Sequence, residues 1–96
     1  MEKIHFTWDE QKNITNIKKH GVSFIEAAKV YFDPERLEIY DEEHSTLDEE
    51  RWSIIGNTEM KILFAVIIKP AENLIKIISA RYATKKEQEA YYGNRC

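Results

Sequence analysis

A seven-residue apolar run from Ile62 to Ile68 constrains the fold more than any other feature of the chain. Its sequence is Ile-Leu-Phe-Ala-Val-Ile-Ile, so neither face of a strand formed there carries a polar side chain. A strand with two apolar faces has to be covered on both of them, which places it in the middle of a sheet. We therefore expect residues 61–69 to form the central strand of the domain.

Further strands are expected on both sides of this run. Residues 51–57 read as a strand with a glycine near its end, and residues 36–40 as a short peripheral one. The polar, acidic segment 41–50 between them is expected to be a solvated loop. Residues 70–73 form a turn signal, after which residues 74–82 pair back as a hairpin. Short connections between successive strands predict an antiparallel sheet of about four strands.

The N-terminal part of the chain predicts a short strand followed by a helix. Residues 4–8 alternate apolar and polar side chains, as a strand does. Asp9 fits a helix N-cap and Gly21 a left-handed C-cap. Between these caps, Ile14 and Ile17 are spaced to mark a buried stripe.

Two capping boxes predict the other helices. Ser23–Glu26 opens a second helix, which ends at Asp33-Pro34 because proline disfavours helical backbone in the residue before it. Thr84–Glu87 opens a last helix that runs to about Tyr92. With the helices packed on one face of the antiparallel sheet, the fold class is α+β.

Size and charge narrow the function. The 96 residues form a single domain, 1–96, and the net charge of −3 argues against a broad nucleic-acid surface. Any RNA site must be a local basic pocket on an acidic body. The lone cysteine, Cys96, is interpreted as an exposed tail thiol, and no Cys/His spacing indicates a zinc site. No apolar run approaches ~18 residues, so we expect a cytoplasmic protein without a membrane span, metal or cofactor.

Arg81 is the first candidate for chemistry. Strict alternation along residues 74–82 puts it on one face with Ile75, Ile77 and Ser79. It stands at the end of the strand, just before the helix start at Thr84, where free N–H groups and the helix dipole favour a phosphate. Arg81 could equally form a structural ion pair with an acidic neighbour, such as a carboxylate of the 41–50 loop or Glu87.

Other basic residues extend this candidate site. Arg51 shares a face with Ser53, Ile55 and Asn57, so it could reach the same cleft, and Lys85 and Lys86 add charge nearby. Two arginines suit a phosphodiester clamp, because the guanidinium fork binds two phosphate oxygens and stays charged.

RNA can be cleaved without a metal if its own 2′-hydroxyl attacks, a base accepts the proton and cations stabilise the phosphorane. His20, at a helix end, is the natural acid/base candidate, although it could simply complement the helix dipole. Trp8 and Trp52 could stack on bases, but packing is the preferred interpretation. The acidic residues of the 41–50 loop resemble metal ligands, yet a solvated loop is the better interpretation.

A set of short motifs in fixed order resembles the BrnT family over about residues 6–92. The set consists of Phe6-Thr7-Trp8-Asp9, Lys19-His20-Gly21-Val22-Ser23-Phe24-Ile25-Glu26-Ala27, Asp33-Pro34, His44-Ser45, Glu49-Glu50-Arg51, Ile55-Gly56 and Ile77-Ile78-Ser79-Ala80-Arg81. The chain departs from the family at Glu59-Met60-Lys61, where a glycine-basic pair is frequent, which argues against a tight turn there. Lys76 also replaces a frequent arginine.

The resemblance implies a RelE-like toxin fold and metal-independent RNA cleavage that inhibits translation. It also implies a BrnA-type ribbon-helix-helix antitoxin as partner, in a hetero-oligomer that binds operator DNA only through the antitoxin and represses its own operon. By motif, it assigns Arg51 and Arg81 to transition-state stabilisation, His20 or Glu50 to acid/base chemistry, and Lys19 to RNA binding. The alternative is a non-enzymatic co-repressor or anion-binding module that acts only with a DNA-binding partner.

Overall fold

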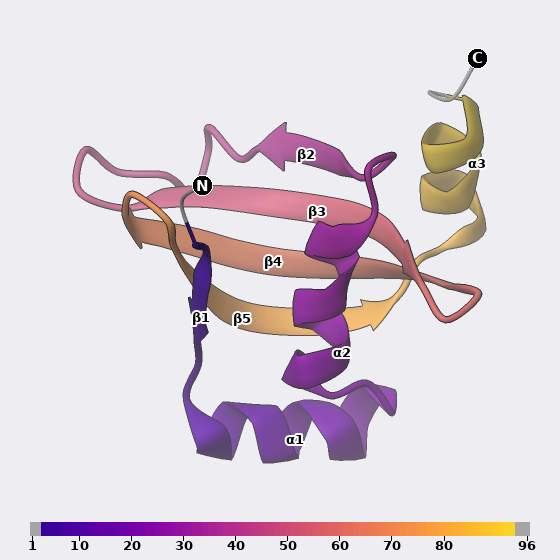
Figure 1. Ribbon diagram of the computed structural model, residues 1–96, viewed down its shortest axis with the longest axis horizontal. Coiled ribbons are helices and arrows are strands. Elements are labelled where there is room, and N and C mark those ends of the chain that lie inside the picture. The colour runs from indigo at the N-terminus through magenta and orange to yellow at the C-terminus, as the bar shows by residue number, and fades with distance from the viewer. Residues whose placement is uncertain (1–2, 94–96) are drawn as a thin grey trace.

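The computed structural model describes residues 3–93 and has the expected α+β class (Figure 1). Its elements in chain order are β1 (His5–Thr7), α1 (Glu10–His20), α2 (Phe24–Ala28), the 3-10 helix η1 (Lys29–Phe32), β2 (Leu37–Tyr40), β3 (Glu50–Thr58), β4 (Lys61–Ala71), β5 (Leu74–Tyr82) and α3 (Lys85–Gly93). Within this range, no helix has the length and apolar character needed to cross a membrane.

The sheet has five strands in the order β1-β5-β4-β3-β2. The expected central strand is confirmed, since β4 pairs antiparallel with both β3 and β5. The expectation of about four antiparallel strands was wrong in detail, because β1 joins the edge of the sheet parallel to β5, with His5 opposite Leu74. The partner of β1 lies almost seventy residues further along the chain, so no local turn signal could report this pairing.

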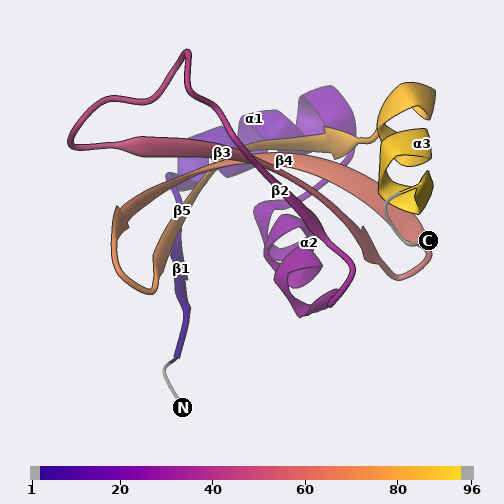
Figure 2. The same ribbon diagram turned by 90° about the horizontal axis from the view of Figure 1, so that it is seen from above.

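Helices cover both faces of the sheet, contrary to the expectation of one. The main core lies between α2 and the sheet and includes Phe24, Ile54 and Leu63, each with no exposed surface. On the other face, Tyr91 of α3 packs against Ile55 and Ile62. Figure 2 shows α2 and α3 on opposite sides of the sheet. We call the side that α2 covers the α2 face.

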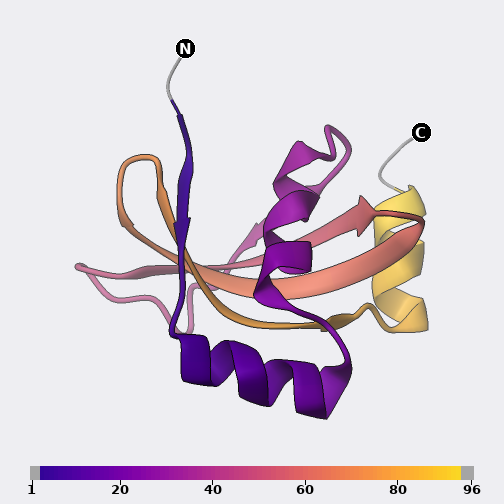
Figure 3. The same cartoon turned by 60° about the horizontal axis from the view of Figure 1, so that its bottom comes forward.

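The caps of α1 are confirmed, but its expected buried stripe was wrong. Asp9 accepts a hydrogen bond from the Lys12 N–H, and Gly21 adopts a left-handed conformation. Ile14 and Ile17 are 38% and 44% exposed, whereas the residues that face the sheet are asparagines. The reason is that α1 lies along the edge of β5, where backbone groups need hydrogen-bonding partners, as Figure 3 shows from below.

Asn16 supplies those partners. Its side-chain amide donates to the carbonyl oxygens of Ala80 and Val22, both at 2.8 Å, and accepts from the Ala80 N–H at 3.2 Å. Asn13, also buried, accepts from the first N–H of α2, that of Phe24, at 2.8 Å. One helix is thereby tied both to β5 and to the start of the next helix.

A β-bulge in β5 overturns the strict alternation expected for residues 74–82. Ile67 is opposite Ile77 but Val66 is opposite Ser79, so Ile78 is an extra residue. An inserted residue reverses which face the following side chains occupy. Ile75 and Ile77 therefore lie in the main core on the α2 face, while Arg81 lies on the opposite face.

The turn between β3 and β4 is tight despite its unfavourable sequence. Thr58 pairs directly with Lys61, and the two residues between them, Glu59 and Met60, have φ angles of 50° and 68°. Positive φ at both central positions is the geometry of a type I′ hairpin. The argument from sequence against a tight turn was wrong, because the long ladder on either side holds the residues in this conformation.

Candidate functional site

The sheet face opposite α2 carries basic side chains over an apolar floor. Directly paired residues on neighbouring strands share a face. We call this surface the open face; its residues are Arg51 and Ser53 of β3, Phe64, Val66 and Ile68 of β4, and Lys76, Ser79 and Arg81 of β5. One end of it is closed by α3.

Arg51 lies at one end of the open face, in a row with Ile68 and Lys76. Its backbone is fixed by the preceding loop, since the Arg51 N–H donates to the Ser45 hydroxyl at 2.9 Å. Within residues 3–93, its guanidinium forms no ion pair or hydrogen bond, and its Nε–H is buried. A buried donor without a partner costs free energy, so an acceptor bound to this Nε–H would be stabilising.

Arg81 lies at the other end of the open face, in the row of Phe64 and Ile55. That row is four residues along β3 from Arg51 and two strands across, so the two Cα positions are about 16 Å apart. The prediction that Arg51 could reach the same cleft as Arg81 therefore needs correction: the two arginines share a sheet face but stand at its opposite ends.

The guanidinium of Arg81 is held by Glu87, one of the alternatives considered from sequence. Nη1 and Nη2 donate to the two carboxylate oxygens at 2.8 and 2.9 Å. The Thr84 N–H donates to the same carboxylate at 2.9 Å, which completes the predicted capping box. The hydrogen bonds from Arg81, with that from Thr84, hold the pKa of Glu87 below its ordinary value despite partial burial. The helix start expected to receive a phosphate thus already holds an internal carboxylate.

His20 and Lys19 lie beside the open face. They line a surface hollow of 300 Å³ between α1 and β5 that also includes Lys12, Ile78 and Ser79. Ser79 precedes Arg81 by two residues on the same face, so the structure brings His20 and Lys19 close to the Arg81 end. Lys85 and Lys86 are exposed in the first turn of α3, directly after that end.

Glu50 does not join this group. It lies on the α2 face, where its carboxylate accepts a hydrogen bond from the Trp52 indole at 3.2 Å. Successive residues of a strand point to opposite faces, so Glu50 and its neighbour Arg51 are separated by the sheet. The packing interpretation of the tryptophans is confirmed: Trp52 contacts Tyr40, and Trp8 contacts Phe24, both edge to face.

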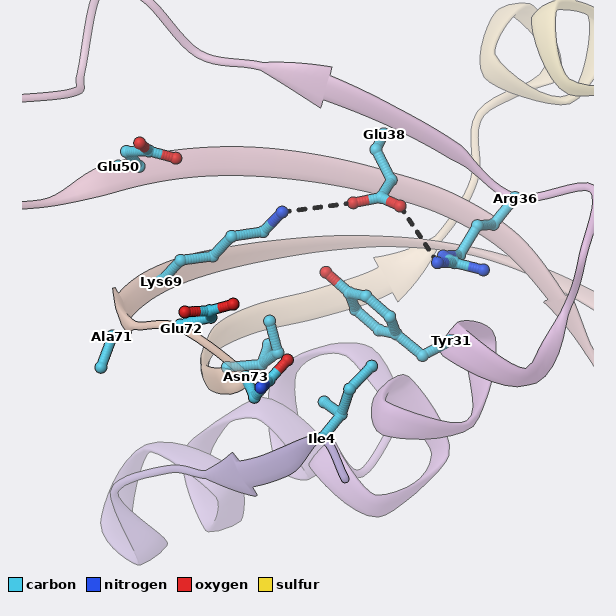
Figure 4. Close-up of a pocket in the computed structure, with 10 residues that line it drawn as sticks. Ile4, Tyr31, Arg36, Glu38, Glu50, Lys69, Ala71, Glu72 and Asn73 are labelled. Carbon is cyan, nitrogen blue, oxygen red and sulfur yellow. Dashed lines mark hydrogen bonds and ion pairs between the residues drawn. The ribbon is translucent and has the colours of Figure 1, made fainter. Parts of the chain in front are cut away.

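A surface hollow of 470 Å³ lies beside Glu50 on the α2 face (Figure 4). Glu38 forms ion pairs there with Arg36 at 3.1 Å and with Lys69 at 3.4 Å. Burial, with the charge of Glu38 adding to it, raises the pKa of Tyr31 to about 12. Both cations of this hollow thus form ion pairs with Glu38, although the Arg36 Nε–H and the Tyr31 hydroxyl are buried without a hydrogen-bond partner within residues 3–93.

Sequence reasoning missed two features of the candidate site. Lys76 is on the open face with Arg51 rather than on the face opposite Arg81, because the bulge lies between them. Phe64 is the surface on which Arg81 rests, with the guanidinium carbon 4.2 Å from the ring centroid. The alternation of β4 alone places Phe64, and an aromatic residue opposite an arginine is a readable signal once the register is known.

Residues 3–93 hold no group of three or more His, Cys, Asp or Glu side chains arranged to bind a metal ion. The 41–50 loop is exposed as expected, and its acidic start is occupied locally, since Asp41 pairs with His44 at 2.9 Å. Cys96 lies outside the described residues.

Comparison with known proteins agrees with this architecture. The sequence model of the family described as "Ribonuclease toxin, BrnT, of type II toxin-antitoxin system" matches residues 8–87. A crystal structure of the Brucella abortus ribonuclease toxin BrnT is similar in fold, with a TM-score of 0.64 and 24% identity over 86% of this chain and 100% of that chain. No curated protein matches the sequence. Because the family match spans most of its length, the chain belongs to the BrnT family of ribonuclease toxins of type II toxin–antitoxin systems.

Proposed function

We propose that this protein is a metal-independent endoribonuclease that binds RNA across the open face and inhibits translation. The observation that carries the proposal is the buried Nε–H of Arg51, which has no hydrogen-bond partner within residues 3–93 and lies on the same sheet face as Arg81. RNA phosphates are the anions that a ribonuclease offers to such a group, and arginine binds them through two parallel hydrogen bonds. The apolar floor between the two arginines leaves room for the strand that joins the phosphates.

His20 is proposed as the acid/base group. The 2′-hydroxyl of the RNA attacks the adjacent phosphorus and His20 accepts its proton, while Arg81 stabilises the negative charge of the phosphorane. The bond from phosphorus to the 5′-oxygen then breaks, and His20 returns the proton to that oxygen, which leaves a 2′,3′-cyclic phosphate on the other product. Arg51, at the other end of the open face, binds another phosphate of the same RNA strand. The hollow that His20 shares with Ser79 supports this role, because it borders the open face near Arg81. Three exposed cations near the Arg81 end attract the RNA phosphates on either side of the cleaved bond: Lys19, Lys85 and Lys86. Glu50 is not part of the proposed site, since the sheet lies between it and both arginines.

The proposed partner is an antitoxin of the BrnA type, a ribbon-helix-helix protein that binds operator DNA on behalf of the complex. Membership of a type II toxin–antitoxin family supports a protein partner. The net charge of −3 further supports DNA binding by the antitoxin rather than by the toxin. Duplex DNA binding requires a broad basic surface, which an acidic chain does not favour. We place the complex in the cytoplasm, where RNA and operator are both present.

Cleavage of a short single-stranded RNA by the purified protein in the presence of EDTA tests the proposal. We expect wild-type activity to survive EDTA. Arg81→Ala should lower kcat/KM by about a hundredfold or more, because a preorganised donor to the transition state is removed. Arg51→Ala should lower kcat/KM by about tenfold or more, chiefly by raising KM, because a cation for a neighbouring phosphate is lost. His20→Ala should also be impaired.

Lys29→Ala is the matched control, since Lys29 is an exposed cation on the α2 side that pairs with Glu59. It should cleave RNA as the wild type does. Addition of the proposed BrnA-type antitoxin should suppress cleavage. Intact RNA with every variant, combined with operator binding by the two-protein complex, would show a co-repressor instead.

A further inference from the structure

Two capping boxes in this chain have the same form, but only one of them holds an arginine of the open face. Glu26 caps α2 from Ser23 and pairs with Lys61 at 3.3 Å; Glu87 caps α3 from Thr84 and pairs with Arg81 at 2.8 Å. The two glutamate side chains are similarly exposed, 27% and 22%. The two boxes differ in the cation that the glutamate binds, Lys61 or Arg81, and in how many contacts hold that cation in place.

The guanidinium of Arg81 is fixed on three sides. Glu87 takes one hydrogen from Nη1 and one from Nη2, and the Tyr82 carbonyl oxygen takes the second Nη1 hydrogen at 3.2 Å. The ring of Phe64 lies beneath the guanidinium plane. Hydrogen bonds, an ion pair and the ring contact together leave the group little rotational freedom.

The donors that remain form a second fork. A guanidinium has five N–H groups, and three of those of Arg81 donate hydrogen bonds within residues 3–93. The remaining two are the Nε–H and one Nη2–H, which lie on the same side of the guanidinium. This side-on pair has the spacing that two oxygens of one phosphate accept.

We propose that Glu87 is a positioning residue of the ribonuclease site: it binds the end of the Arg81 guanidinium so that the side-on fork faces the RNA phosphate. The proposal rests on the proposed ribonuclease function. Because Glu87 is bound to Thr84 at the start of α3, the orientation of Arg81 is set by the helix rather than by the flexible arginine side chain. Glu87 contacts no substrate and transfers no proton in this role.

Steady-state cleavage of a short RNA by Glu87→Gln, with Glu26→Gln as matched control, tests the proposal. Glutamine still caps the helix, as in capping boxes generally, but it loses the charged, two-oxygen contact with the cation. We expect Glu87→Gln to lower kcat between about tenfold and a hundredfold, as a misplaced transition-state group does. KM should stay the same or fall, because removing a carboxylate beside the site does not weaken phosphate attraction. Glu26→Gln should match the wild type in both constants.

Thermal midpoints of both variants, measured in the same buffer, separate folding from function. A Glu87→Gln protein whose kcat equals that of Glu26→Gln would overturn the proposal and leave the contact a structural ion pair. A higher kcat for Glu87→Gln would also overturn it, by showing that the carboxylate competes with the phosphate. Failure of the proposed function is distinct, because the wild type itself would then leave the RNA intact.

A substrate analogue gives a second readout that does not depend on turnover. A 2′-deoxy oligonucleotide binds without offering the attacking hydroxyl. In the wild type, its addition should shift the NMR resonance of the Arg81 Nε–H, and in Glu87→Gln the shift should shrink severalfold. An unchanged Arg81 Nε–H resonance in the wild type, with oligonucleotide bound, would contradict the assigned fork.

Discussion

Asn16 carries out at the scale of one residue what a neighbouring strand does in a sheet. Its carboxamide has both a donor and an acceptor, and it meets the N–H and the carbonyl oxygen of Ala80 at once. A hydrophobic residue would bury more apolar area at this position but would leave those backbone groups unpaired. An asparagine is favoured here because it faces unpaired backbone groups. Hydrophobic periodicity does not register such groups, so it predicted Ile14 and Ile17 as the buried residues instead.

Replacing Asn16 with alanine should therefore destabilise the fold strongly. The change removes three hydrogen bonds and leaves buried groups of Ala80 and Val22 without partners. We expect the free energy of unfolding to fall by about 3 kcal/mol or more, from about 1 kcal/mol or more for each unsatisfied group. Urea unfolding followed by circular dichroism measures this. Thr15→Ala, on the exposed side of the same helix, should change it by less than about 1 kcal/mol, and equal effects of the two changes would refute the assignment.

At the scale of elements, the turn between β3 and β4 is held in its conformation against local preference. Left-handed backbone costs about 1–2 kcal/mol at a residue with a side chain, and both Glu59 and Met60 adopt it. The nine paired positions of the β3–β4 ladder supply the stabilisation that offsets this cost.

Met60→Gly should raise the free energy of unfolding by about 0.5–1 kcal/mol. Glycine relieves the positive φ, and part of that gain is lost to the greater freedom of the unfolded chain. The methionine side chain is 96% exposed, so its removal costs almost no packing. Thermal unfolding checks the prediction, with Met60→Ala as control for the lost side chain. The prediction fails if alanine stabilises the protein as much as glycine does.

The elements also show where sequence reasoning reaches its limit. The limits of Leu74–Tyr82 and the caps at Asp9, Gly21, Ser23 and Thr84 were predicted, because each depends on residues next to one another in the chain. The sheet face on which Lys76 lies was not predicted, because it depends on a β-bulge that arises from pairing with β4. The parallel position of β1 was missed for the same reason. Arg51 was expected to reach the same cleft as Arg81, but the sheet register shows that the two stand at opposite ends of one face.

On the scale of the whole molecule, the basic groups of the two sheet faces differ in how they are paired. On the α2 side, four cations form ion pairs with carboxylates: Lys29, Arg36, Lys61 and Lys69. The open face carries three others, Arg51, Lys76 and Arg81. Two carboxylates with lowered pKa values, Glu26 and Glu87, lie outside that face at helix starts. At Glu26 burial works in the opposite direction but is outweighed by Ser23 and Lys61. Such carboxylates bind a proton less readily in the folded state than in the unfolded state, which links global stability to pH.

Acid should therefore remove the stabilisation that Glu87 gives. Above the ordinary carboxyl pKa of 4.5, Glu87 is ionised in both states and its contribution is complete. As the pH falls below that value the unfolded state takes up a proton first, and the contribution is lost as the pH passes the lower folded value. The difference in unfolding free energy between the wild type and Glu87→Gln should shrink from about pH 6 to about pH 3. Urea titrations at several pH values measure it, and a constant difference would contradict the lowered pKa.

The contact between Asn16 and Ala80 also affects intermolecular strand pairing, the first step of aggregation in a crowded cell. β1 pairs with the first part of β5, and α1 binds the backbone of its later part, so a strand from another molecule finds little of β5 to pair with. The two outermost strands, β1 and β2, are three and four residues long, and β2 carries the charged Glu38. Short, charged edges resist edge-to-edge pairing. The same asparagine that completes the fold thus protects a small, strand-rich protein from aggregation.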